Sequence, residues 1–471
     1  MDTTAIPHPP HRLPVVGDVV GIDPRAPLQS FMWLMRDLGP ISVEKVFGTE
    51  IVTVGAADLA AELNDETRFC KHVGLTLRPL RRILGDALFT AENDEPNWQL
   101  AHDILAPAFT REAMRGYHTI MLETARELLA RWDAMADRRQ RIDVAADMTR
   151  LTLETIGRAG FGYRFGSFDR DRPHPFVTAM NRTARYANLS AAVPWAPVRR
   201  VMAGSTRQHR ADVALMERIV DEIIQTRRGA VAADAPDLLD LMLRTAHPDT
   251  GRRLDPVNIR QQIIGFIIAG HETTSGALSF ALYYLTQDTG ALARAQAEVD
   301  ALWGEADDVE PAFTDVSKLR YVRAALDEAL RLWPTAPGYL RAARTDTVLD
   351  GRYRMNEGDW VLVLLPLLHR DPLVWPDADR FDPDRFAPGQ AKNRPAHAYK
   401  PFGTGPRACI GRQFALHEAV LALGLVLHRY NLPPPNDYRL RIAESFTLKP
   451  RDFTFVPRRR RFGNSVIRDQ R

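Results

Sequence analysis

Apolar residues recur at helical spacing through the middle of the chain. Leu122–Met135, Ala211–Thr226 and Asn258–Gln287 carry them at the three- and four-residue intervals that predict helices with a buried face. The third stretch is long for a helix of a globular protein. Its start is well marked, because Asp255 can cap a helix and Pro256 suits the first helical position. A helix of that length has to cross the centre of the molecule.

Strand-like patterns are short and few. Ile51–Val54 alternates near the N-terminus, and Trp360–Leu365 is an apolar run. From about residue 370 to residue 402 the chain is rich in proline and aspartate, which predicts a structured meander rather than a helix. The sequence therefore predicts a mainly α fold with small β-sheets. No linker or repeat divides it, so we expect one domain over residues 1–471.

The two ends of the chain have a composition of their own. Residues 1–15 are rich in proline and predict a surface strap, and a basic tail begins at about residue 457. We interpret the run Arg458–Arg461 in that tail as a solvated face. A docking patch and the stub of a linker to a further domain are the alternatives.

Composition and charge limit the classes of function. The net charge of +3, from 62 basic and 59 acidic side chains, gives no reason to expect a nucleic-acid partner. The N-terminus, Met1–Pro14, has no apolar run, and the longest apolar stretches, around Ile263–Ala269 and Trp360–Leu368, are far shorter than a membrane span. The two cysteines cannot form a disulfide framework of the secreted kind. We expect a cytoplasmic protein without a membrane partner.

The most informative segment surrounds Cys409 and reads Phe402-Gly403-Thr404-Gly405-Pro406-Arg407-Ala408-Cys409-Ile410-Gly411. Its glycines and proline predict a tight loop, and Arg412–His428 reads as a helix. The cysteine then lies at a helix N-terminus, where free N–H groups favour a thiolate. A single axial thiolate to haem and a buried inert cysteine are the two interpretations. Cys70 has no such loop and reads as an ordinary cysteine.

The loop fits F-x-x-G-x-R-x-C-x-G and resembles the haem-binding signature of the cytochrome P450 family. The resemblance implies a triangular helical prism that holds haem b (iron protoporphyrin IX) between the long central helix and the cysteine loop. It implies that Cys409 is the metal ligand and that Arg407 bonds a haem propionate. It also implies that Phe402 packs near the thiolate and tunes the haem's potential.

The long helix carries a second motif, Ala269-Gly270-His271-Glu272-Thr273-Thr274, which resembles the family's A/G-G-x-D/E-T-T oxygen-binding segment. By this resemblance Ala269 and Gly270 lie beside the haem, with Gly270 leaving space at the iron. Thr273 donates a hydrogen bond to dioxygen, and Glu272 relays protons from solvent. The alternative is that the Thr273 hydroxyl bonds a carbonyl of its own helix.

Two further motifs are typical of the family. Glu328 and Arg331 form its E-x-x-R pattern, and Arg385 lies in a segment that resembles P-E-R-F. The three would form a buried structural triad that locks the meander under the haem. Trp98 and His102, four residues apart on an expected helix, resemble the family's W-x-x-x-R/H pair that contacts a haem propionate.

The chain also resembles, over nearly its whole length, the haem domain of bacterial self-sufficient fatty-acid hydroxylases. Asp147–Leu153 and Arg331–Pro337 carry this likeness, and agreement is weaker from about Ala184 to Arg210, the expected channel roof with Trp195. Ungapped matching from Leu38-Gly39 implies an apolar substrate pocket, with Phe89 standing over the haem face. The implied pocket residues are Leu77, Leu80, Leu84, Phe89, Ala336 and Phe446.

Two departures separate this chain from those enzymes. They continue into a flavin-containing reductase, whereas this chain ends soon after Val456. They also hold the substrate carboxylate with an arginine and a tyrosine, where this chain has Thr49 and Thr53. Two neutral hydroxyls are weaker partners for a free fatty acid than a charged anchor is. Lys45 and Arg78 are the candidate substitutes.

Taken together, these patterns predict a cytochrome P450 monooxygenase of lipophilic substrates, with a fatty acid or fatty-acyl-like molecule favoured. Dioxygen is the expected co-substrate. Electrons would come from NAD(P)H through an external partner, either a ferredoxin with its reductase or a flavodoxin-type reductase, or through a fused reductase that this chain lacks. A natural-product tailoring oxidase, a peroxide-using or isomerising P450 and a non-catalytic haem sensor or carrier remain as alternatives. The sequence names neither the substrate nor the oligomeric state.

Overall fold

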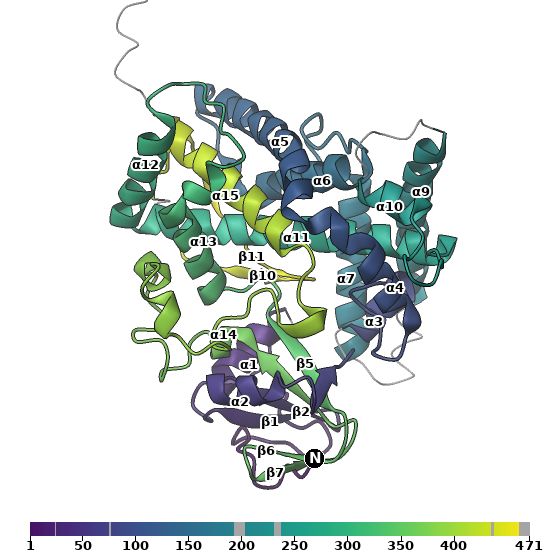
Figure 1. The fold of residues 1–471 in the computed structure, drawn as a ribbon. Helices are drawn as coiled ribbons and strands as arrows, with labels where there is room; N and C mark the ends of the chain where they lie inside the picture. Colours follow the sequence, from purple (N-terminus) through teal and green to yellow (C-terminus); the bar gives the residue numbers. More distant parts are fainter. Residues whose placement is uncertain (24, 75–76, 193–202, 230–236, 435–437, 461–471) are drawn as a thin grey trace, which may run out of the picture.

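The computed structural model describes residues 1–23, 25–74, 77–192, 203–229, 237–434 and 438–460. Within them, a small sheet-containing part lies against a larger helical part (Figure 1). The helices are α1 (Pro27–Met35), α2 (Ala57–Leu63), α3 (Arg78–Leu84), α4 (Pro96–Leu105), α5 (Arg111–Asp137), α6 (Val144–Phe161), α7 (Pro175–Ala192), α9 (Ala203–Arg228), α10 (Leu238–Arg244), α11 (Pro256–Gln287), α12 (Thr289–Trp303), α13 (Arg320–Leu332), α14 (Leu365–Leu368) and α15 (Arg412–Arg429).

The largest sheet of the described chain has five strands in the order β1-β2-β8-β5-β3. The β1–β2 hairpin turns at Phe47 and Gly48, both with positive φ, as its tight turn requires. Four further pairs are short: β10 with β11, β12 with β4, β13 with β9 and β6 with β7. The strands are β1 (Ile41–Val46), β2 (Thr49–Val54), β3 (Phe69–Lys71), β4 (Ile142–Asp143), β5 (Gly338–Ala343), β6 (Thr347–Leu349), β7 (Tyr353–Met355), β8 (Trp360–Leu364), β9 (Tyr430–Asn431), β10 (Ile442–Glu444), β11 (Leu448–Pro450), β12 (Thr454–Phe455) and β13 (Arg458–Arg459).

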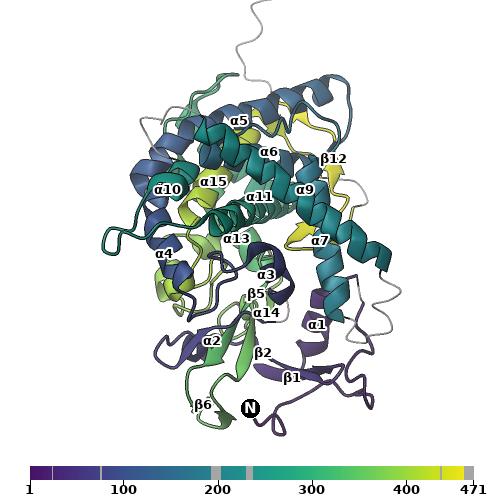
Figure 2. The same cartoon turned by 90° about the vertical axis from the view of Figure 1, so that its right-hand side faces the viewer.

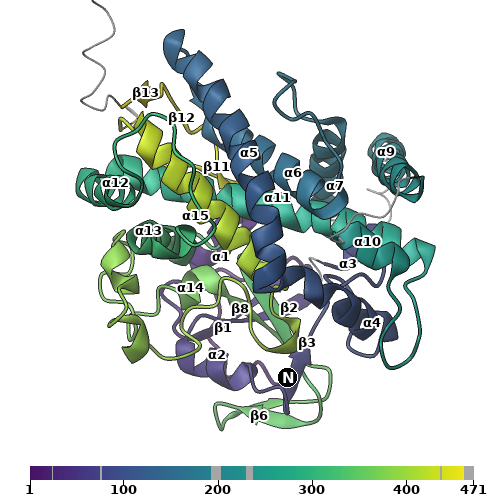
Figure 3. The same cartoon turned by 45° about the horizontal axis from the view of Figure 1, so that its top comes forward.

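The central helix α11 organises the helical part. Its N-cap Asp255 accepts hydrogen bonds from the N–H groups of Val257 and Asn258, both at 2.9 Å, and Pro256 occupies the first turn. With 32 residues it spans about 48 Å. Figures 2 and 3 show it running through the molecule, with α6, α13 and α15 near its middle. The predicted central helix is therefore confirmed.

The apolar side chains form two buried clusters. The larger cluster joins the helices, with α6, α11, α13 and α15 at its centre, and the smaller one joins the five-stranded sheet to α2 and the N-terminal residues. Ile6 is buried in the smaller cluster, and the N–H of Val43 donates to the carbonyl of Pro7 at 2.9 Å. The N-terminal segment therefore crosses the sheet as the predicted strap.

The predicted elements agree well with the observed ones. The mainly α fold with small sheets is confirmed, and β8 and α15 begin at the predicted residues. Several boundaries differ. Leu365, for example, starts α14 rather than ending the strand, because Pro366 in its first turn favours a helix start. Between α14 and α15 the described chain carries three short 3-10 turns, as expected of a meander.

The described part of the basic tail forms ion pairs, although Arg459 is also exposed. Arg458 and Arg459 form β13, and Arg459 binds Asp133 at 2.9 Å and Asp137 at 2.6 Å on α5. Arg460 binds Asp300 on α12 at 2.5 Å. Acidic residues far away in the sequence neutralise these two arginines. Arg461 lies outside the described residues.

The expected channel roof is described only in part. Residues 193–202, including Trp195, lie outside the described residues. The helices on either side, α7 and α9, pack together, and Arg182 binds Asp212 between them at 2.5 Å. In the described part of the chain, no helix is both long and apolar enough to cross a membrane.

Candidate haem site

One stripe of α11 is open although the helix runs through the core. Ala269 is exposed, and Phe266, Gly270 and Thr273 are half-buried, whereas most neighbouring residues of the helix are buried. These positions are three and four residues apart, so they lie on one face. An open face in the middle of a central helix indicates an internal hollow beside it.

The cysteine loop is open in the same way. Gly403 and Gly405 take positive φ values of 71° and 68°, which lets the loop turn tightly, and the N–H of Cys409 donates to the carbonyl of Phe402 at 2.8 Å. The loop ends where α15 begins, at Arg412. Cys409 is exposed, although it lies inside the molecule, so its thiol faces a hollow rather than the outer surface.

Phe109 connects the two open surfaces. Its ring stacks on that of Phe266 at 5.9 Å between centroids. On its other side, a Cβ added to Gly411 would lie 3.8 Å from the ring edge of Phe109. One side chain therefore contacts both α11 and the cysteine loop, from which we infer that Thr273 and Cys409 border the same hollow.

Two effects act in opposite directions on the thiol of Cys409. Burial raises the pKa of the thiol, and the hydrogen bond from the N–H of Gly411 offsets only part of that rise. Desolvation therefore outweighs the helix end. A coordinating thiol loses its proton to the metal, so a bound iron ion would reverse this protonation.

Cations without an ion pair lie at one edge of the hollow. Arg407 donates to the carbonyl of Ala91 at 2.6 Å and stacks over the ring of Trp98 at 4.5 Å. Trp98 in turn stacks on His102 at 5.1 Å. Burial lowers the pKa of Arg407 to about 10. Burial, followed by the charge of Arg407, lowers the pKa of Lys71 to about 7.

This donor set fits haem. Within the described residues, neither Arg407 nor Lys71 forms an ion pair, so both lack the anion that would restore an ordinary pKa. Two propionates would supply that charge, and the thiol of Cys409 would supply the iron ligand. Arg407, Trp98 and His102 form one stack, and their contact with haem stays a prediction. Lys71 was missed, because β3 carries no motif that distinguishes it.

Gly270 lies at a close contact between two helices, and its role in leaving space at the iron stays a prediction. A Cβ added there would lie 3.0 Å from Cγ1 of Ile156 on α6, tighter than ordinary contact. The glycine therefore allows α6 and α11 to approach closely. The hydroxyl of Thr273 donates to the carbonyl of Ala269 at 2.8 Å. This is the bond within its own helix that was the alternative to a bond with dioxygen.

Glu272 is held away from the open stripe. Its side chain is buried, with one oxygen 2.9 Å from Nζ of Lys449 and the other accepting from the hydroxyl of Thr447 at 3.2 Å. Nε2 of His271 lies 3.2 Å away. None of these contacts joins Glu272 to Thr273. Sequence reasoning missed Lys449 and Thr447, although two polar residues two apart in a strand share one face.

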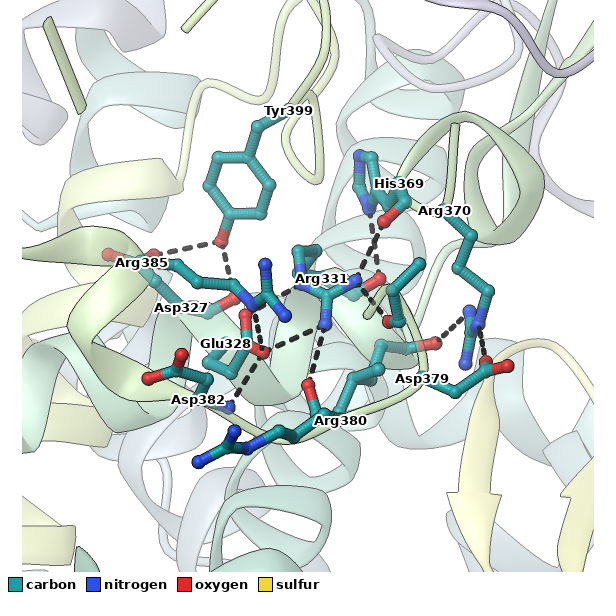
Figure 4. A network of polar contacts seen from close by, with 12 residues as sticks. Asp327, Glu328, Arg331, His369, Arg370, Asp379, Arg380, Asp382, Arg385 and Tyr399 are labelled. Atoms are coloured by element: carbon teal, nitrogen blue, oxygen red, sulfur yellow. Dashed lines mark hydrogen bonds and ion pairs between the residues drawn. The ribbon is translucent and has the colours of Figure 1, made fainter. Parts of the chain in front are cut away.

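Figure 4 shows the contacts around Glu328 and Arg331. The two side chains are 0% exposed and form a bidentate pair at 2.7 and 2.8 Å. Arg385 lies 3.4 Å from the same carboxylate. Arg331 also donates to three carbonyl oxygens of the chain after α14, and the N–H of Asp382 donates to Glu328. The cluster joins α13 to the meander.

The six candidate pocket residues do not behave alike. Ala336 is exposed, Leu77 and Phe446 are half-buried, and Phe89 is 47% exposed. Leu80 and Leu84 are only 5% and 1% exposed, because they turn into the helical core. Both belong to the larger apolar cluster. For all six, a role in substrate binding stays a prediction.

The candidate anchor positions do not offer free hydroxyls side by side. Thr49 is exposed, but Thr53 is 2% exposed and donates to the carboxylate of Glu44 at 3.3 Å. Burial raises the pKa of Glu44 to about 7. Lys45 lies 3.7 Å from Glu50. Among the described residues Arg78 has no ion pair, and it is exposed.

Comparison with known proteins places the chain in a family. The family described as Cytochrome P450 matches residues 7–456. A bifunctional cytochrome P450/NADPH–P450 reductase of Bacillus cereus is 43% identical over 475 residues, which cover 98% of this chain and 43% of that protein. A second bifunctional cytochrome P450/NADPH–P450 reductase, from Bacillus subtilis, is 46% identical over 436 residues. The aligned residues cover 92% of this chain and 41% of that protein.

Similarity is not restricted to bacteria. A self-sufficient cytochrome P450 monooxygenase of the fungus Phanerodontia chrysosporium is 39% identical over 455 residues, which cover 96% of this chain and 42% of the relative. The chain thus spans less than half the length of these relatives. The family match extends over nearly all the elements that surround the hollow and includes the cysteine loop. The chain belongs to the cytochrome P450 family.

Proposed function

We propose that this chain is a haem-thiolate monooxygenase that inserts one atom of O2 into a C–H bond of a lipophilic substrate. The observation that carries the proposal is the hollow between Cys409 and the open stripe of α11 with Thr273. When bound there, haem supplies dioxygen activation and the oxidising chemistry. The chain itself supplies an iron ligand, apolar walls and groups that hold or move protons.

Each side chain has a distinct part in this proposal. Cys409 holds the iron, and Arg407 with Lys71 neutralises the propionates. Ala269 leaves one face of the haem accessible. The Thr273 hydroxyl orients dioxygen and passes a proton toward it. This role fits its position, because the Thr273 side chain is half-buried on the open stripe. Phe402 packs against the loop and tunes the potential.

Electrons would enter near the start of α15. A groove of about 840 Å³ lies there, lined by residues that include Arg111, Arg320, Gln413 and His417. Arg111, Arg320 and the nearby Arg412 are exposed. Complementary charge speeds the encounter of two proteins, so we propose an acidic electron carrier as the redox partner. A ferredoxin with its reductase and a flavodoxin-type reductase both have this chemistry.

The variant Thr273→Ala tests the function. With a surrogate reductase system, the wild-type protein is expected to consume NADPH and O2 in a substrate-dependent way and to release hydroxylated product. In the variant, product per NADPH falls by about ten-fold or more, because the proton-donating hydroxyl is lost. The missing electrons appear as hydrogen peroxide. The measurement is product, peroxide and NADPH in one reaction.

Thr274→Ala is the matched control for that experiment. Thr274 is the neighbouring threonine but is buried away from the open stripe, so coupling is expected to stay close to that of the wild type. Equal coupling in wild type and Thr273→Ala would remove Thr273 from proton delivery. Absence of substrate-dependent oxygen consumption across a broad panel of lipids and polycyclic metabolites would favour a sensor or carrier instead.

We propose that the substrate is a fatty acid or fatty-acyl-like molecule that is held mainly by apolar contacts. The buried Thr53 is already bonded to Glu44, so it does not add a free partner for a carboxylate. We therefore expect a long-chain fatty acid and its methyl ester to shift the haem spin state at similar concentrations, within about three-fold. A charge-assisted anchor would favour the acid by ten-fold or more.

Spectral titration of the acid and the ester measures this difference directly. Acid binding more than ten-fold tighter than ester binding would contradict purely apolar recognition. Arg78→Ala then tests the candidate substitute anchor, because Arg78 is exposed and forms no ion pair with the described residues, and Arg82→Ala, at a second exposed arginine of α3, is its control. Loss of the preference in Arg78→Ala would assign the anchor to Arg78, and its persistence would exclude Arg78.

A further inference from the structure

Three buried carboxyl groups lie in different electrostatic surroundings. Glu418 on α15 and Glu44 on β1 are 2% and 0% exposed, and burial raises their pKa values to about 8 and about 7. Glu272 is just as buried, at 2% exposed, and burial acts on it in the same direction. The charge of Lys449 nevertheless outweighs burial, and the pKa of Glu272 is lowered.

The contacts of Glu272 explain why it differs from the other two. Nζ of Lys449 lies 2.9 Å from one carboxylate oxygen, and the Thr447 hydroxyl donates to the other at 3.2 Å. Both partners belong to the β10–β11 hairpin or border it. His271, on the same helix, also acts on the carboxylate, and α6 contributes Thr149, which accepts from Lys449 at 3.1 Å.

The hairpin is pressed tightly against α11. A Cβ added to Gly276 would lie 2.6 Å from the carbonyl oxygen of Leu448, so glycine is required there. The N–H of Leu448 donates to the carbonyl of Thr335 at 3.0 Å, which fixes the strand from its other side. Lys449 is therefore brought to Glu272 by rigid backbone packing rather than by a mobile loop.

A relay cannot run through Glu272 while this ion pair is closed. Both carboxylate oxygens are bound on the hairpin side, and the Thr273 hydroxyl donates to Ala269 instead of to Glu272. A carboxylate with a lowered pKa is also a poor proton donor at neutral pH. For delivery, the pair has to open so that the carboxylate can turn toward the stripe.

We propose that Lys449 is a positioning residue that holds Glu272 ionised on the β10–β11 hairpin, so that proton delivery to Thr273 requires this ion pair to open. With the pair open, a hydronium ion from solvent gives its proton to the carboxylate and leaves water. The carboxylic acid passes a proton to the Thr273 hydroxyl, which donates its own. Solvent can approach Lys449, whose side chain is 15% exposed. The delivery step rests on the proposed function, whereas the ionisation of Glu272 does not.

Lys449→Met tests the proposal, because it removes the charge and keeps a long side chain. Without the cation, we expect the pKa of Glu272 to rise toward those of Glu44 and Glu418, about 7 and about 8. Infrared difference spectra of the resting haem-loaded protein, recorded between about pH 5 and pH 9, should gain a protonated carboxyl band that titrates in this range. Glu44 and Glu418 titrate in the same range in the wild type and in every variant, so the result to look for is the additional band in Lys449→Met.

Three further variants make the infrared result specific. The new band should disappear in Lys449→Met combined with Glu272→Gln, which assigns it to Glu272. Lys449→Arg keeps the positive charge and should resemble the wild type. Lys318→Met removes an exposed lysine that pairs with Asp315 at 2.9 Å, and it should add no band. Haem content and circular dichroism report whether each variant is folded.

The possible outcomes separate this inference from the proposed function. Absence of the additional band in folded Lys449→Met, or a wild-type band that Glu272→Gln removes, would overturn the positioning role of Lys449. If the band appears but no substrate is ever oxygenated, Lys449 still controls the charge of Glu272 and the function fails alone. In an active enzyme, product per NADPH in Lys449→Met should decrease as the pH rises through the new pKa, because the acid form is lost. A pH profile unchanged from wild type would contradict the gate.

Discussion

Cys409→His is expected to abolish the thiolate-type absorbance of the reduced carbon monoxide complex and to reduce oxygenation by orders of magnitude. The exposed thiol of Cys409 faces the hollow, and the loop that carries it is fixed by the hydrogen bond to Phe402. An imidazole can still bind iron, but it lacks the electron donation by which a thiolate promotes O–O cleavage. Absorbance difference spectra of equal amounts of haem-loaded protein measure the effect.

Cys70→Ser is the control for this substitution. Cys70 lies in β3 with its thiol 3.7 Å from the carbonyl of Ala342, and burial raises its pKa, so it stays a protonated thiol. The carbon monoxide spectrum of this variant should match the wild type. Loss of the thiolate spectrum in Cys70→Ser, or its retention in Cys409→His, would contradict the assignment of Cys409 as the iron ligand.

The parts of this protein that the sequence predicts well are those whose signals are local. Asp255 and Pro256 mark the start of α11 because a cap and a proline act on the next few residues. The glycines around Arg407 and Cys409 mark a tight turn in the same way. Such signals do not depend on what the rest of the chain does, so both the helix and the cysteine loop could be placed from sequence.

The parts that the sequence missed depend on contacts between distant residues. Lys449 meets Glu272 across 177 positions of the chain, and Lys71 meets Arg407 through the fold of β3 against the cysteine loop. The direction of the Cys409 pKa also depends on total burial, which no local pattern reveals. The sequence also could not show that Leu80 is 5% exposed within the helical cluster, because an apolar helix face can turn toward core or cavity with the same sequence.

Glu328→Gln is expected to have the largest effect on stability, with a loss of about 3–5 kcal/mol in the free energy of unfolding. The substitution keeps the shape of the side chain but removes its charge. Arg331, which is 0% exposed, would then be a buried cation without its bidentate partner, and Arg385 would lose its contact at 3.4 Å. Urea unfolding followed by circular dichroism measures the change.

The effect should extend to the meander because Arg331 also holds its backbone. Its guanidinium donates to the carbonyl oxygens of His369, Ala378 and Arg380, and these bonds depend on the orientation that Glu328 imposes (Figure 4). We therefore expect faster proteolysis between α14 and α15 in Glu328→Gln. Arg385→Met should cost less, because Arg331 still neutralises the carboxylate.

Glu112→Gln is the matched control, because it removes the same charge from an exposed pair. Glu112 lies 3.8 Å from Arg115 on α5, and its side chain is 86% exposed, so water and ions already screen the interaction. Its cost should stay below about 1 kcal/mol. If Glu328→Gln cost no more than Glu112→Gln, the buried cluster would not anchor the meander. A large difference between them would mean that desolvation of Arg331, rather than the count of ion pairs, stabilises the protein beneath the cysteine loop.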